Sequence, residues 1–155
     1  MNKKPTTGGI VVVIAGAIVF LASFFAFYTF KAPRVTFGAT TIGGTANYSA
    51  WNKAALFPVS AIPAWIGLIM AVQVAATAWG GLRTPDRILG FTWPQIHVVL
   101  GFQAALLMLA YLIRDNSVLD FGFGFWLMLL GSIGLAVGGV MLTREGAAAT
   151  GPALS

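Results

Sequence analysis

The chain has 155 residues, of which 58% are hydrophobic and 8% are charged, and its formal net charge is +5. Soluble domains carry about 25% charged residues, so this composition excludes an ordinary water-soluble fold and favours a surface that faces lipid. The chain contains no cysteine, which excludes disulfides, thiol catalysis and cysteine-ligated metals. The basic residues are scattered between apolar runs without a recognition motif, so we expect no binding to nucleic acid.

Four apolar runs are long enough to cross a bilayer, for which about 20 residues are needed. They cover residues 9–30, 59–80, 92–113 and 121–142. We therefore predict an all-α, polytopic membrane protein in which residues 1–145 form a single four-helix transmembrane bundle. The first run is longer than the apolar region of a signal peptide and no A-x-A site follows it, so we expect it to stay as the first helix.

The segment between the first two runs, residues 31–58, is too long for a simple turn. It has β-branched and aromatic residues on both sides of the pair Gly43-Gly44. This pattern predicts a small β-hairpin that lies on the membrane surface. Tyr48 and Trp51 follow it, and we expect them to contact a partner protein on the outer side.

The positions of the basic residues indicate how the chain is oriented in the membrane. If the N-terminus is cytoplasmic, five of the nine basic residues lie on the inner side: Lys3, Lys4, Arg83, Arg87 and Arg144. Two of these share the short loop 81–91, whereas three of the four outer basic residues are spread over the long loop 31–58. The positive-inside rule therefore predicts that both termini are cytoplasmic. We expect residues 146–155, which are mostly small, to form a flexible cytoplasmic tail.

Among the polar side chains inside the predicted spans, two glutamines and the histidine are candidates for contacts between helices. Gln73 and Gln103 lie at similar predicted depths on neighbouring antiparallel helices, and His97, the one histidine, lies near the inner interface. Polar groups in hydrocarbon usually face the bundle interior and pair with one another. We therefore expect these residues to form interhelical polar contacts, with a hydrogen bond between the two glutamines.

His97 could also act as a haem ligand or a proton relay. A haem held by two histidines needs a second one, and a relay normally adds an acidic residue within the spans. The chain offers neither. We therefore expect no cofactor and no metal, and a structural or partner-contact role for His97.

The last run contains glycines at helical spacing, namely Gly131, Gly134 and Gly138. Small residues at this spacing let two helix backbones approach closely. Packing inside the bundle explains them, but so does docking of another protein's membrane helix, and we take this face as a candidate docking surface.

Three segments resemble a broad group of small four-helix membrane proteins from actinobacteria: ASFFAFYTF at 22–30, SAWN at 49–52 and FGFGFWLMLLGSIGLAVGGVML at 121–142. In that group the first helix ends in an aromatic cluster, an Ala-Trp step follows in an outer loop, and the fourth helix opens with Phe-Gly repeats. The resemblance implies a bacterial plasma membrane and, through some members, a link to the cell envelope. It implies no catalytic residues.

No phosphate-binding loop, nucleophile triad or metal-ligand spacing occurs in the sequence. We therefore predict a non-enzymatic accessory or stabilising subunit of a larger cell-envelope complex, such as a lipid transporter or a cell-wall machine, with the bilayer and other integral membrane subunits as partners. One alternative is a small oligomeric transporter or channel with Gln73, His97 and Gln103 lining a shared pore. Another is a redox membrane anchor that holds haem or a quinone near His97.

Overall fold

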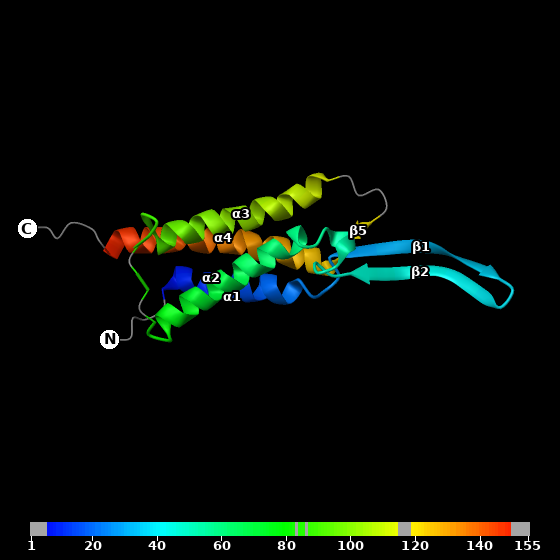
Figure 1. Ribbon diagram of the computed structural model, residues 1–155, viewed down its shortest axis with the longest axis horizontal. Helices are drawn as coiled ribbons and strands as arrows, with labels where there is room; N and C mark the ends of the chain where they lie inside the picture. The colour runs from blue at the N-terminus through cyan, green and yellow to red at the C-terminus, as the bar shows by residue number, and fades with distance from the viewer. Residues whose placement is uncertain (1–5, 83, 86, 115–118, 150–155) are drawn as a thin grey trace, which may run out of the picture.

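The computed structural model describes residues 6–82, 84–85, 87–114 and 119–149. In this part of the chain four α-helices lie side by side along the long axis of the molecule (Figure 1): α1 (Thr7–Ala22), α2 (Ile62–Ala78), α3 (Trp93–Ile113) and α4 (Phe123–Ala149). The four-helix bundle predicted from the sequence is confirmed. Two short 3₁₀ turns, η1 (Lys53–Ala55) and η2 (Val59–Ala61), lead into α2, and a small ribbon of β3 (Arg87–Ile88) and β4 (Phe91–Thr92) leads into α3.

Among the described residues, three stretches are helical, apolar and long enough to cross a membrane: Val59–Ala78, Trp93–Ile113 and Phe123–Ala148. The first helix is also apolar but shorter, because α1 ends at Ala22 and not at residue 30 as predicted. The chain turns at Ser23, whose hydroxyl donates to the Phe20 carbonyl at 2.6 Å. The aromatic segment that follows then enters a strand, since aromatic residues suit a sheet as well as a helix.

The last helix is longer than predicted. It continues beyond residue 142 to Ala149, so residues 146–149 of the expected tail are helical, and residues 150–155 lie outside the described part. One contact ties this extension to α1: Glu145 Oε1 accepts a hydrogen bond from the Gly8 backbone N–H at 3.0 Å. This carboxylate satisfies a donor at the start of α1, where an anion also interacts favourably with the helix dipole.

The predicted hairpin is present, but its turn lies elsewhere. Strand β1 (Tyr28–Phe37) pairs antiparallel with β2 (Thr40–Tyr48), and the chain reverses at Gly38, which has a φ of +60°. Gly43 lies inside β2, opposite a bulge in β1, and a Cβ on it would overlap the Pro33 carbonyl. The glycine pair therefore accommodates the bulge and does not form the turn.

The hairpin also points in an unexpected direction. Figure 1 shows that β1 and β2 extend beyond the end of the bundle, roughly along its long axis, rather than across it. Its base is fixed by β5 (Asp120–Phe121), which pairs with β1 at Tyr28 and Thr29, so the sheet has the order β2-β1-β5. The hairpin thus stands away from the helices instead of lying flat over their ends.

Rings fill the space where the sheet meets the bundle. Phe27 is fully buried and packs edge to face on Tyr111 of α3 and Phe125 of α4, with ring centroids 5.1 and 5.2 Å apart. Tyr28 stacks on Phe121 of β5 at 5.5 Å. Such aromatic pairs add to the energy of burial, so the base of the hairpin is held firmly by α3 and α4.

Candidate functional site

The outer-loop residues proposed as partner contacts are engaged within the chain. Trp51 Nε1 donates to Ser23 Oγ at 3.0 Å, and its ring stacks on Phe24 with centroids 5.6 Å apart. Tyr48 is half-buried, and it pairs with Tyr28 across the hairpin. Trp51 therefore ties the outer segment to the end of α1, and Tyr48 packs against the hydrophobic core.

The glycine face of α4 is also covered by the chain itself. A Cβ on Gly134 would lie 3.1 Å from the Ala15 Cβ, and a Cβ on Gly138 would lie 3.1 Å from the Val12 nitrogen. Gly131 meets the same helix, at Val19. The expected docking surface for another protein's helix is thus occupied by α1, and these glycines set the close approach of α1 and α4.

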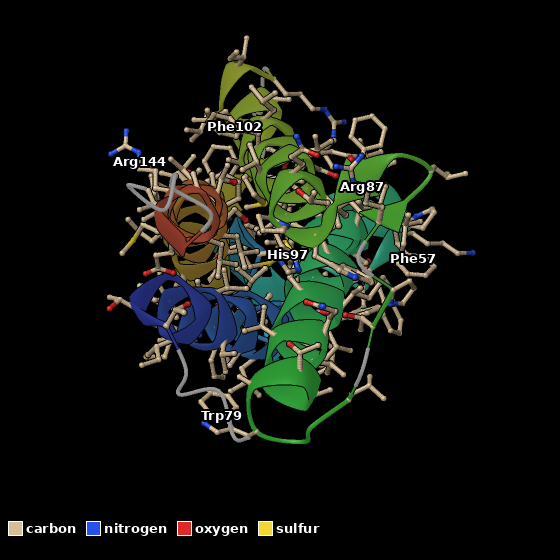
Figure 2. All side chains as sticks on the ribbon, turned by 90° about the vertical axis from the view of Figure 1, so that its left-hand side faces the viewer. Phe57, Trp79, Arg87, His97, Phe102 and Arg144 are labelled. Carbon is tan, nitrogen blue, oxygen red and sulfur yellow. The ribbon has the colours of Figure 1, made fainter. Side chains whose placement is uncertain are left out.

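The buried polar groups do not pair as expected. His97 is 3% exposed and lies toward the middle of the bundle (Figure 2), and its Nδ1 has no hydrogen-bond partner among the described residues. Gln73 Oε1 is likewise buried without a partner in that part of the chain. Unpaired polar atoms destabilise a protein interior, so neither residue contributes through a protein hydrogen bond at these atoms.

Gln103 lies on the other side of α3. Its side chain is exposed, whereas Gly101, Ala104 and Met108 of the same helix are buried. The expected hydrogen bond between Gln73 and Gln103 is therefore absent from the described contacts. The small residues of α3 already mark its inward face at helical spacing, and that pattern places Gln103 outward.

The sequence predicted the hairpin but did not reveal that it is amphipathic. Cross-strand partners and alternate residues share a face of a sheet. One face carries apolar pairs, namely Phe30–Ala46, Ala32–Gly44 and Val35–Ile42. The other carries polar pairs, namely Thr29–Asn47, Lys31–Thr45 and Thr36–Thr41.

The bulge keeps the two faces separate. Pro33 and Arg34 together oppose Gly43, so β1 gains one residue between Ala32 and Val35. Without this extra residue, the strict alternation of a strand would turn Val35 to the polar face. Cross-strand contacts on the polar face agree with the register, since Thr36 Oγ1 and Thr41 Oγ1 are 3.3 Å apart.

Nothing among the described residues covers the outer half of the apolar face. Val35, Phe37 and Ile42 are 46%, 68% and 61% exposed. The outer edge of β2 is also open, because the sheet ends with this strand. β2 contains no charged residue and no proline, which are the usual features that block pairing at an edge.

The described residues offer no metal site, since they contain no group of three His, Asp or Glu side chains that could hold an ion. The described residues also present three surfaces for contact with other molecules, namely an apolar sheet face, an open strand edge and the outward face of α3. Comparison of the chain with protein-family models, curated proteins and solved structures finds no match.

Proposed function

We propose that the chain is a non-enzymatic accessory subunit of a bacterial cell-envelope membrane assembly, and that the hairpin is its docking element. The supporting observation is the projecting hairpin, with an uncovered apolar face and an open, uncharged edge. A lone two-stranded hairpin is marginally stable in water. A partner that covers this hairpin would stabilise it, which favours a role in assembly.

The proposed location is the plasma membrane, with both termini in the cytoplasm and the hairpin outside. This orientation rests on the positive-inside bias of the sequence. α1 is 16 residues long, which corresponds to about 24 Å of helix, somewhat less than the ~30 Å of hydrocarbon. The aromatic cluster around Trp51 and Phe24 then lies at the outer interface, where aromatic residues concentrate.

The proposed occupant is an extended segment of an extracytoplasmic partner domain. Such a segment would add a strand to β2 and cover the apolar face. Its charge is expected to be acidic, because residues 28–48 contain Lys31 and Arg34 but no Asp or Glu. Lys31 already lies 3.4 Å from Asp120, and both side chains are exposed, so a further carboxylate can approach.

Lipid is less suited than a protein segment to cover the apolar face of the hairpin. The hairpin extends along the bundle axis (Figure 1), so its apolar face stands upright relative to a membrane crossed by the helices. The transport alternative required one pore lined by Gln73, His97 and Gln103, yet Gln103 lies on the outward side of α3. We therefore propose no second function.

The test compares two glutamate substitutions on the polar face of the hairpin. Thr41→Glu places a negative charge on the open strand β2, where it would repel an acidic partner segment, and Thr36→Glu places the same charge on its cross-strand partner in β1. Both remove the same contact between hydroxyl groups. The tagged full chain is purified from its native membrane in mild detergent, and the co-purifying proteins are quantified by mass spectrometry.

We expect one defined membrane complex with the wild type and with Thr36→Glu. Thr41→Glu should lower its recovery by about 10-fold or more, which corresponds to ~1.4 kcal/mol of binding free energy. Equal recovery with both variants would show that the β2 edge is not the docking site. Absence of any stoichiometric complex with the wild type would overturn the accessory function itself.

A further inference from the structure

α3 presents a long uncovered face to the outside of the bundle. About a third of the apolar stretch of α3 is buried inside the protein, compared with half of the apolar stretches of α2 and α4. A shallow groove of about 600 Å³ runs along this face, lined by Val98, Val99, Phe102, Gln103, Leu106 and Leu107. Figure 2 shows Phe102 on the outer side of α3, away from the position of His97.

Gln103 is the polar member of this otherwise apolar lining. It lies ten residues into a helix of 21 residues, and therefore close to the middle of the span. An amide in hydrocarbon has no water to bind, and polar residues in membrane helices almost always face protein or a water-filled cavity. Its outward position is thus unfavourable in lipid, unless another helix covers it.

We propose that the covering helix is α3 of a second copy of this chain, and that the two Gln103 side chains meet at the two-fold axis. A glutamine amide has both a donor and an acceptor group, so two copies can form a reciprocal pair of hydrogen bonds. A two-fold axis parallel to the bundle places the same face on both copies. It also keeps both bundles in one membrane with the same orientation.

The composition of the face fits a second copy. The groove lining carries no charge, so pairing buries no ion and brings no like charges together. Val99 and Leu106, which are 60% and 62% exposed, lie one turn on either side of Gln103 and would pack around the amides. This inference depends on the proposed membrane location of α3 but not on the docking role of the hairpin.

The absence of native cysteine allows a direct test by single-cysteine crosslinking in native membranes. Val99→Cys and Leu106→Cys report on the proposed interface. Ile69→Cys on α2 and Ile133→Cys on α4 are matched controls, since both residues are exposed and apolar at 58% and 43%. Each variant is treated with a short bismaleimide and separated on a denaturing gel.

We expect a crosslinked product of twice the 16.3 kDa chain mass from the α3 variants, and little from the controls. Crosslinking of all four positions to the same extent would indicate random collision and overturn the proposal. A product with a different protein in place of the second copy would overturn it as well. Both results would leave the hairpin experiment unaffected.

A second measurement tests the contribution of the Gln103 amide to dimer formation. The fraction of dimer in liposomes, counted by single-molecule photobleaching, should fall with Gln103→Leu, since interhelical polar contacts of this type change association by about 3- to 30-fold. Gln103→Asn should retain part of the dimer. Gln73→Leu removes a glutamine from the bundle interior and should leave the dimer unchanged. A Gln103→Leu protein that dimerises like the wild type would refute the role of the amide.

Discussion

The crossing of α1 and α2 allows a quantitative test of the packing. Gly16 lies at the crossing, where a Cβ would overlap the Gly67 carbonyl oxygen and lie 2.8 Å from the Ala71 Cβ. Ordinary carbon contacts are about 3.5–4.0 Å, so Gly16→Ala requires the two helices to separate by about 1 Å. Overpacking of this kind costs roughly 1–3 kcal/mol.

A matched glycine separates this steric cost from helix propensity. Alanine is the better helix former by about 1 kcal/mol in a helix interior, and Gly146→Ala makes the same exchange in the last turn of α4. The Cβ on Gly146 would meet nothing closer than Pro94 Cγ at 4.0 Å. The difference between the two variants therefore reports mainly the packing, and we expect Gly16→Ala to be less stable by roughly 1–3 kcal/mol.

The assay is reversible unfolding in mixed micelles, with helicity followed by circular dichroism as the fraction of denaturing detergent rises. Gly67→Ala should fall between the other two variants, because its Cβ would lie 3.2 Å from the Gly16 oxygen and 3.3 Å from the Val19 Cβ. Equal stability of Gly16→Ala and Gly146→Ala would refute the close backbone contact between α1 and α2.

Three further substitutions are expected to change stability in the same assay. Glu145→Ala removes the acceptor of the Gly8 N–H at 3.0 Å and should cost about 0.5–2 kcal/mol; an unchanged midpoint would contradict this cap. Ser23→Ala leaves Trp51 Nε1 without the acceptor it has at 3.0 Å and should cost about 1–3 kcal/mol, whereas wild-type stability would show that the indole has another partner. His97→Leu exchanges a buried ring, whose Nδ1 has no partner among the described residues, for an apolar side chain, so stability should stay within about 0.5 kcal/mol or rise. A large loss with His97→Leu would reveal a partner of the imidazole in the native protein.

Hydropathy predicted the helices well where the whole apolar run is helical. The predicted spans 92–113 and 59–80 compare closely with α3 (Trp93–Ile113) and α2 (Ile62–Ala78). The predicted end of the first helix was wrong, because hydropathy does not distinguish an aromatic strand from a helix. Residues 24–30 are apolar in either state, and pairing of β1 with β2 and β5 decides the outcome.

The candidate site was harder to predict, because it depends on the directions in which side chains point and not on composition. The positions of Gln103 and Gln73 along their helices were evident from the sequence. The small residues of α3 could have indicated that Gln103 faces outward, but whether Gln73 faces a neighbouring helix depends on how α2 is rotated in the bundle. The hairpin faces depend on one extra residue at Pro33 and Arg34. A single-residue bulge has no strong sequence signal, and the glycines opposite it resemble a turn.

The most direct test of the docking hairpin is cysteine labelling of intact cells with a membrane-impermeant maleimide. Ile42→Cys lies on the apolar face that the partner is proposed to cover, and Ala39→Cys lies at the exposed turn. We expect Ala39→Cys to react rapidly in intact cells. Ile42→Cys should react slowly there, and rapidly once the purified chain is separated from its partners. Equally rapid labelling of both positions in cells would contradict the covered face, and absence of labelling at both would contradict a hairpin on the outer side.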